Sequence, residues 1–139
     1  MARGKSHVNA RSITIDNIVF PSRMEGNRYL ELKSLQEEGK ISELSTQPRF
    51  TFDRRGIKIF NLLDTKIRHY TADFKYLEDE VWVIEEVKGR MMPEASLRIS
   101  VFKALYPEYK FKIIRGKKRV KRKKISRKRT GKKRKRKAN

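Results

Sequence analysis

Glu86 and Lys88 are the charged residues whose setting in the sequence best suits catalysis. They form one of four Glu-x-Lys triplets in the chain, and the triplet by itself says little. This one differs from the others because it continues the apolar run Val-Trp-Val-Ile at residues 81–84 and is followed by Gly89. Side chains alternate between the faces of a strand, so Ile84, Glu86 and Lys88 are predicted to point the same way. A carboxylate and an ammonium group then continue an apolar face.

Asp73 is predicted to face this pair across a hairpin. Residues 66–77 and 81–87 are both rich in β-forming side chains, and a short acidic segment joins them. If residues 79–80 are the two central turn residues, Asp73 lies opposite Glu86, with Cβ atoms about 4.5–5.5 Å apart. Moving the turn back by one residue would shift Asp73 by one pair along the same face, and a three-residue loop would break the alignment.

Two neighbouring carboxylates and a lysine can perform phosphodiester hydrolysis with a metal ion. The carboxylates of Asp73 and Glu86 repel each other, and a hard, oxygen-seeking ion such as Mg²⁺ removes that conflict. Such an ion activates a water and stabilises charge on phosphate oxygens, while Lys88 would orient the water or offset negative charge. Mn²⁺ would serve equally well. The alternative is that the three side chains form an ordinary cross-strand ion-pair cluster.

Glu25 is a candidate fourth member of this site. It lies in the first turn of a helix predicted to begin after Ser22 and to stop at Gly39. It precedes Tyr29 by four residues and Leu32 by seven, so it falls on the apolar stripe of that helix. Its carboxylate could be a further metal or water ligand, or it could be the glutamate of a capping box with Ser22.

Other polar side chains have simple structural interpretations. His69 has no partner at a metal-binding spacing and is interpreted as structural. Gln47 could reach the site, but a hydrogen bond to loop backbone is favoured. Arg98 and Lys103 could contact phosphates, yet a solvated helix face is the simpler interpretation.

The remaining pattern predicts one α/β domain. The expected elements are a hairpin or bent strand over residues 13–20, a helix over 22–38, short extended pieces over 41–60 with a turn at 53–56, the hairpin described above, a helix from Pro93 to before Pro107, and a strand over 109–114. The second helix carries Leu97, Val101 and Leu105 at intervals of four. Three aromatic side chains are expected in the core: Phe50, Phe74 and Trp82.

Positive charge is concentrated at the C-terminal end of the chain. Residues 115–139 hold 17 of the 37 lysines and arginines and none of the 16 acidic residues. Such a block is typical of a segment that stays disordered until it meets a polyanion, and nucleic acid fits better than a membrane because the segment lacks aromatic and leucine side chains. The residues expected to contact phosphates are Lys117, Lys118, Arg119, Lys121, Arg122, Lys123, Lys124, Arg127, Lys128 and Arg129.

The chain is thus divided into a flexible N-terminus (1–12), one folded domain (13–114) and a basic segment (115–139). It has no cysteine, which excludes disulfides and zinc-cysteinate sites. It also lacks an apolar stretch of signal-peptide or membrane-spanning length, so an intracellular protein is expected. Residues 132–137 would fit a nuclear-import signal as well as a DNA-binding segment.

Several short motifs together resemble a known family. They occur in order over roughly residues 13–114 and are Phe20-Pro21-Ser22 with Glu25, Arg28 and Tyr29; Gln47-Pro48; Tyr70-Thr71-Ala72-Asp73-Phe74; Glu85-Glu86-Val87-Lys88-Gly89; and Tyr106-Pro107. The sequence resembles small phage-encoded PD-(D/E)XK nucleases, a group related to Holliday-junction resolvases. The basic C-terminal segment is not part of that pattern.

The resemblance implies a restriction-endonuclease-like fold, with a mixed sheet flanked by helices. It also implies that Glu25, Asp73 and Glu86 bind the metal and that Lys88 assists catalysis. The expected activity is Mg²⁺-dependent cleavage of branched DNA, commonly by a homodimer, in phage recombination, replication or packaging within an infected bacterial host. A nuclease without branch preference and a non-catalytic ribosomal or architectural nucleic-acid-binding protein are the alternatives.

Overall fold

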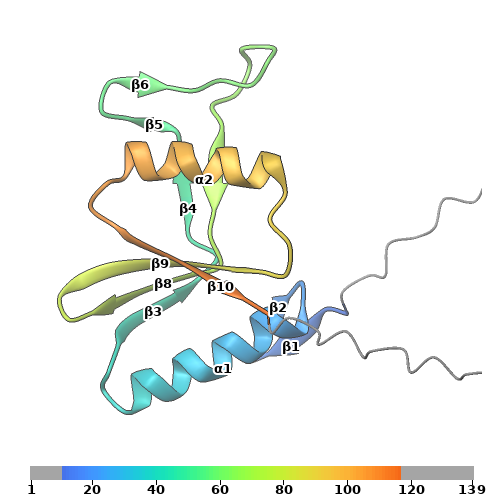
Figure 1. Ribbon diagram of the computed structural model, residues 1–139, viewed down its shortest axis with the longest axis vertical. Coiled ribbons are helices and arrows are strands. Elements are labelled where there is room, and N and C mark those ends of the chain that lie inside the picture. Colours follow the sequence, from blue (N-terminus) through green and yellow to red (C-terminus); the bar gives the residue numbers. More distant parts are fainter. Residues whose placement is uncertain (1–10, 117–139) are drawn as a thin grey trace, which may run out of the picture.

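The centre of the fold is a four-stranded mixed sheet. The structure is a computed structural model that describes residues 11–116, and Figure 1 shows its arrangement. The strands lie in the order β10 (Lys110–Arg115), β9 (Val81–Lys88), β8 (Phe74–Glu78) and β3 (Ser42–Thr46). β10 runs parallel to β9, whereas the other neighbours are antiparallel. β9 is therefore hydrogen-bonded on both sides.

Two helices cover opposite faces of this sheet. α1 (Arg23–Glu37) lies on one side and α2 (Pro93–Leu105) on the other, as Figure 1 shows. α2 also forms the crossover that connects β9 to its parallel neighbour β10. The expectation of an α/β domain with a mixed sheet flanked by helices is confirmed. The narrower assignment to the PD-(D/E)XK fold stays a prediction.

Besides the main sheet, residues 11–116 form three short two-stranded ribbons. β1 (Ile13–Ile15) and β2 (Ile18–Phe20) form the predicted N-terminal hairpin. β4 (Arg49–Thr51) pairs with β7 (His69–Thr71), and β5 (Asp53–Arg54) pairs with β6 (Ile57–Lys58). In Figure 1 the β5–β6 ribbon and the segment leading to β7 lie beyond α2.

The β8–β9 hairpin has the register that places Asp73 opposite Glu86. Its turn consists of Asp79 and Glu80, whose φ angles are 48° and 63°. Positive φ at both central residues is the geometry of a two-residue turn that matches the twist of the strands. The pairing continues to Phe74 opposite Glu85, so the next pair outward is Asp73 and Glu86.

The prediction of one continuous strand over residues 66–77 is wrong. The segment breaks after β7, and β8 begins at Phe74. The backbone N–H of Ala72 donates to the carbonyl of Pro48, whereas the N–H of Asp73 donates to the carbonyl of Glu85. The chain thus changes pairing partner between these two residues and passes from the β4–β7 ribbon into the main sheet.

The start of α1 is held by a cap and by a close approach to β1. Ser22 is the N-cap, and its hydroxyl accepts a hydrogen bond of 3.2 Å from the backbone N–H of Glu25. Gly39, with φ 76°, follows the last turn as predicted. Gly26 faces β1 so closely that a Cβ there would stand 2.6 Å from Cγ2 of Ile13.

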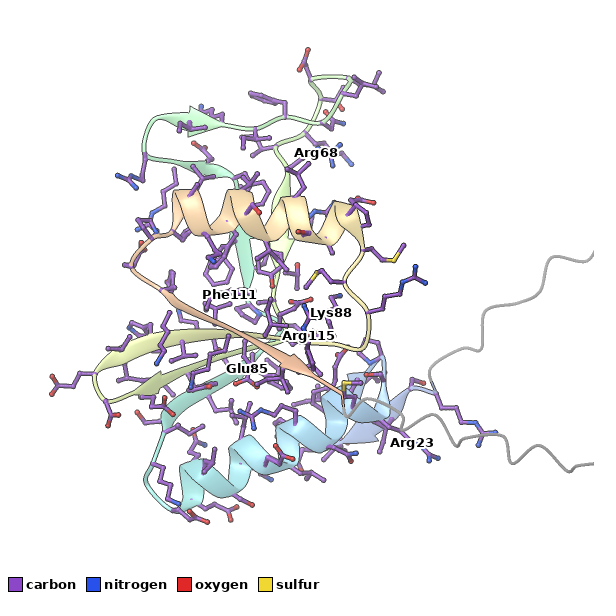
Figure 2. All side chains as sticks on the ribbon, in the orientation of Figure 1. Arg23, Arg68, Glu85, Lys88, Phe111 and Arg115 are labelled. Atoms are coloured by element: carbon purple, nitrogen blue, oxygen red, sulfur yellow. The ribbon has the colours of Figure 1, made fainter. Side chains whose placement is uncertain are left out.

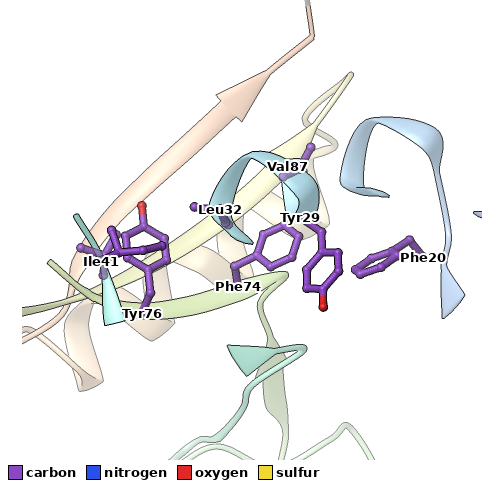
Figure 3. Close-up of a cluster of buried hydrophobic side chains, with 8 residues drawn as sticks. Phe20, Tyr29, Leu32, Ile41, Phe74, Tyr76 and Val87 are labelled. Carbon is purple, nitrogen blue, oxygen red and sulfur yellow. The ribbon is translucent and has the colours of Figure 1, made fainter. Parts of the chain in front are cut away.

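Hydrophobic clusters fill the space on both sides of the sheet. The cluster under α1, shown in Figure 3, consists of Phe20, Tyr29, Leu32, Ile41, Phe74, Tyr76, Val83 and Val87. The cluster under α2 consists of Phe50, Phe52, Tyr70, Ala72, Ile84, Ile99, Phe102 and Leu105. Phe50 and Phe74 are therefore core residues, as expected.

Two expectations about apolar side chains are wrong. The buried stripe of α2 is Ile99, Phe102 and Leu105, whereas Leu97 is 68% exposed. Trp82 is 36% exposed, because it lies near the hairpin end of β9, and the ammonium of Lys75 sits 4.5 Å from its ring centroid.

Neither helix in residues 11–116 is long and apolar enough to cross a membrane. The predicted phosphate-contacting residues at positions 117–129 lie outside the described range.

Replacing Gly26 with alanine is expected to destabilise the protein by about 1–2 kcal/mol. The added methyl group collides with the β-branched side chain of Ile13, and this cost exceeds the helix preference of alanine over glycine. Urea denaturation followed by circular dichroism measures the change. Asn27→Ala, at the exposed next position of the same helix, is the control, and a Gly26→Ala protein as stable as that control would contradict the close packing.

Candidate active site

Asp73 lies at the break between β7 and β8, where its backbone and side chain both bond to β9. Its Oδ2 atom accepts a hydrogen bond of 2.7 Å from the backbone N–H of Val87. Its own N–H donates to the carbonyl oxygen of Glu85 at 3.2 Å. These two bonds hold the carboxylate against the last residues of β9.

Glu86 is buried beside it, on the face of the sheet that α2 covers. Only 4% of the residue is exposed, and one carboxylate oxygen accepts a hydrogen bond from the hydroxyl of Tyr70. The other oxygen lies 3.0 Å from Nζ of Lys88. Lys88 is half-buried at the end of β9, and Figure 2 shows it between the sheet and α2. The ion pair foreseen as the alternative role of these side chains is therefore present between Glu86 and Lys88.

Glu25 approaches the same end of β9 from the first turn of α1. The neighbouring Met24 places its terminal methyl group 3.7 Å from the position that a Cβ on Gly89 would occupy. Glu25 is half-buried, and burial, followed by the charge of Glu86, raises the pKa of its carboxyl, while Lys88 and a hydrogen bond with Ser22 oppose the shift. The structure thus brings all four predicted residues within range of each other's charge.

The carboxyl of Asp73 is the most perturbed acid of this group. Burial, and then the nearby charge of Glu86, raise its pKa to about 7, although the hydrogen bond from Val87 lowers it. Glu25 contributes a smaller rise and Lys88 a smaller fall. The negative charge around Asp73 is therefore only partly neutralised by the protein's own cationic and hydrogen-bonding groups.

The carboxylates also shift the pKa values of Lys88 and Tyr70, the two groups that contact Glu86. Burial lowers the pKa of the Lys88 ammonium, but Glu86, Asp73 and Glu25 together raise it by more, so it stands above its ordinary value. Burial and the bond to Glu86 raise the pKa of the Tyr70 hydroxyl. Lys88 is thus held as a cation and Tyr70 as a neutral hydrogen-bond donor at neutral pH.

The donor chemistry of the cluster suits a hard divalent cation, since three carboxylates supply only oxygen ligands. Within residues 11–116, however, no group of three or more histidine, cysteine, aspartate or glutamate side chains is already arranged to hold a metal ion. Both oxygens of Glu86 are bonded to Tyr70 and Lys88. Glu25, Asp73 and Glu86 fit such an ion in chemical type, and binding one would require their side chains to reorient.

A cavity of about 140 Å³ opens beside Glu86 and Lys88. Tyr70, His69 and Arg98 also line it. The sequence favoured a structural role for His69 and a solvated face for Arg98. The structure places both beside the candidate site, and the side chain of Arg98 is 38% exposed. Gln47 was expected to bond to loop backbone; its side-chain amide donates to a backbone carbonyl at 3.5 Å, but that carbonyl belongs to Val19 of strand β2.

Glu85 is a buried charge that sequence reasoning did not single out. It is fully buried on the opposite face of β9, where the Arg28 guanidinium donates to both carboxylate oxygens and the hydroxyl of Tyr76 donates at 2.7 Å. A signal was present, because Glu85 continues the alternation of Val83 and Val87 on the apolar face under α1. A carboxylate at that place requires a cationic partner.

The fold and the site define a mixed α/β domain with a cluster of three acids and a lysine at the end of its central strand. Residues 5–122 match the family described as "Protein of unknown function (DUF1064)", and the chain belongs to that family. No curated protein matches the chain. No solved structure matches it either.

Replacing Arg28 with leucine is expected to cost about 3–5 kcal/mol of stability, because it leaves the charge of Glu85 buried without its cation. The double variant Arg28→Leu/Glu85→Leu should be less destabilised than Arg28→Leu alone, since the stranded charge is gone. Urea denaturation of both variants tests this. Arg23→Leu, at an exposed position of the same helix, is the control. If the double variant is the least stable of the set, the ion pair is not what holds α1 to β9.

In buffer containing EDTA, Asp73→Asn is expected to become more stable than the wild type as the pH rises. The unfolded chain releases the Asp73 proton near pH 4, whereas the folded protein holds it to about pH 7. Wild-type stability therefore falls across this window, and Asn removes the loss while it keeps an acceptor for the Val87 N–H. A gain of roughly 1–2 kcal/mol at pH 8, absent at pH 4, should appear in urea denaturation. Asp79→Asn at the exposed turn controls for net charge, and parallel pH curves for Asp73→Asn and wild type would contradict the perturbed carboxyl.

Proposed function

We propose that this protein is a Mg²⁺-dependent endodeoxyribonuclease that hydrolyses phosphodiester bonds in branched DNA such as Holliday junctions. The observation that carries the proposal is the cluster at the end of the central strand, where the partly buried carboxylate of Asp73, the buried carboxylate of Glu86 and the ammonium of Lys88 meet. Burial and the charge of Glu86 raise the pKa of Asp73 to about 7, which is the mark of a place that favours added positive charge. The resemblance to small phage-encoded PD-(D/E)XK nucleases supports the same assignment.

In this proposal the residues of the site have two roles, which are to bind a cation and to act on the phosphate or the attacking water. Glu25, Asp73 and Glu86 would hold the cation, and Mg²⁺ or Mn²⁺ there would activate a water and neutralise charge on the phosphate. The Val87 N–H holds Asp73 in place, and the Tyr70 hydroxyl orients Glu86. Lys88 orients the attacking water or offsets negative charge on the phosphate oxygens once it is released from Glu86.

The partners follow from the same proposal. The basic segment at residues 115–139 adds contacts to DNA phosphates that do not depend on sequence, with affinity that falls as salt rises. A homodimer would supply the two symmetric cuts that a four-way junction requires. The place of action is the cytoplasm of an infected bacterial cell, in phage recombination, replication or packaging.

A second candidate function is DNA binding without cleavage. It is favoured by the ion pair of Glu86 with Lys88 and by the lack, within the described residues, of a ready group of three metal ligands. On this alternative the acids and Lys88 stabilise the fold, and the basic groups alone recognise nucleic acid.

Asp73→Ala and Lys88→Ala are each expected to lower Mg²⁺-dependent cleavage by about 100-fold or more. The assay follows a fluorescent four-way junction in the presence of Mg²⁺ or EDTA, and EDTA should abolish cleavage by the wild type. Asp79→Asn and Lys58→Ala, which change exposed charges away from the site, are controls and should cut normally. A wild type that binds DNA but never cuts it would establish the second candidate, and active Asp73→Ala or Lys88→Ala proteins would overturn the site.

The same assay on a linear duplex of matched length and salt tests the branch preference. The junction should be cut faster because two symmetric sites are presented at once to a dimer. Equal cleavage rates for the junction and the duplex would show that the nuclease has no preference for branched DNA.

A further inference from the structure

A second, larger cavity lies against the candidate site, between the β4–β7 ribbon and α2. Its volume is about 580 Å³. Arg49 comes from β4, His69 from β7 and Arg98 from α2, while Asn61, Lys66 and Arg68 come from the segment that leads into β7. Figure 2 shows Arg68 on the side of α2 away from Lys88. Elements distant in the sequence thus place four basic side chains around one hollow.

The positive charge of this cavity is largely unbalanced. Within the described part of the chain, no acidic residue lines it. The side chain of Arg98 pairs with Glu94 at 3.1 Å, and that of Arg49 lies within hydrogen-bonding distance of the imidazole of His69. Among residues 11–116, no side chain forms an ion pair or hydrogen bond with the side chains of Lys66 and Arg68, and both residues are exposed. A cavity with this lining attracts anions.

His69 adds a neutral hydrogen-bond donor to the cavity. Nη2 of Arg49 lies 3.2 Å from Nδ1 of His69, and since a guanidinium can only donate, Nδ1 accepts and the proton resides on Nε2. Burial, together with the charges of Arg49 and Arg98, lowers the pKa of the imidazole, so the ring stays neutral at physiological pH. The imidazole therefore offers an N–H group without adding a charge of its own.

The large cavity and the small cavity of the site are neighbours, because His69 and Arg98 line both. A ligand that reaches Glu86 and Lys88 through the small cavity meets these two residues next, and then Arg49, Lys66 and Arg68. Among residues 11–116, no phenylalanine, tyrosine or tryptophan lines the large cavity, and most of its side chains are cationic. Its chemistry suits a chain of phosphates and does not read a base sequence.

We propose that this cavity binds the sugar-phosphate backbone of the DNA strand immediately beside the phosphodiester held at Asp73, Glu86 and Lys88. The inference rests on the proposed function for the identity of the ligand, and it adds a contact surface within the folded domain, separate from the basic C-terminal segment. Arg98 and His69 sit at the boundary between the two cavities and receive the phosphate next to the scissile one. Arg49, Lys66 and Arg68 receive the phosphates beyond it. The strand therefore leaves the site between the β4–β7 ribbon and α2.

The test compares two double variants of the full-length protein that lose the same charge. Lys66→Gln/Arg68→Gln removes two cations of the cavity, whereas Lys58→Gln/Lys110→Gln removes two exposed lysines outside it. Fluorescence anisotropy with a labelled DNA duplex and a labelled four-way junction, in EDTA so that nothing is cut, yields the affinity at several salt concentrations. The slope of log K against log salt should become less steep by about 2 for the cavity variant, because about one unit is lost for each phosphate contact removed. The control variant should change the slope by less than half as much.

Thermal melting of each variant establishes that the exposed substitutions leave the fold intact. Equal slopes and affinities for the two double variants would overturn the cavity as a DNA-binding surface, even if the protein cuts DNA. If the wild type never cuts DNA but Lys66→Gln/Arg68→Gln selectively loses binding, the proposed nuclease activity would be refuted. The cavity would then stand as a binding site for the DNA backbone. The two failures are therefore distinguishable.

Discussion

The structure depends on two successive carboxylates of β9 that point to opposite faces of the sheet. Glu85 faces α1 and is neutralised by Arg28 and Tyr76, whereas Glu86 faces α2 and meets Tyr70 and Lys88. Because β9 pairs with β8 over residues 81–85 and with β10 over residues 83–88, each side chain is held on its own face of the sheet. A register slip of one residue would exchange the two carboxylates and leave each without its partner. One carboxylate therefore joins α1 to the sheet, and its neighbour belongs to the acidic cluster on the other face.

The change of pairing partner after Ala72 is the second feature that shapes the site. It allows Asp73 to bond to β9 through both its backbone and its side chain, directly beside Glu86. The same change separates the β4–β7 ribbon from the main sheet. That ribbon carries Arg49 and His69 toward α2, so the acidic cluster and the basic cavity arise from a single departure of the chain from regular pairing.

The charges of the two regions have opposite signs and are complementary to one ligand. Carboxylates that favour a cation lie at the end of β9. The cations Arg49, Lys66 and Arg68 line the adjoining cavity, which shares His69 and Arg98 with the small cavity of the site. A phosphodiester chain with a divalent cation satisfies both. In the described part of the molecule this juxtaposition supports nucleic-acid chemistry more directly than the overall positive charge does, since net charge by itself only indicates a polyanionic partner.

The sequence by itself determined the features that depend on neighbouring residues. Ser22 and Gly39 set the limits of α1, because caps are decided by local φ and ψ angles. The acidic segment at residues 78–80 indicated the hairpin but left its register open, and the structure selects the turn at Asp79 and Glu80 that pairs Asp73 with Glu86. The tertiary structure decided what depends on distant packing. It brought Arg28 to Glu85 across 57 residues, ended a strand that propensity alone would continue, exposed Trp82 and Leu97, and placed the partly exposed Arg98 beside the site. Alternation and spacing state which side chains share a face, but only the packed elements determine what that face meets.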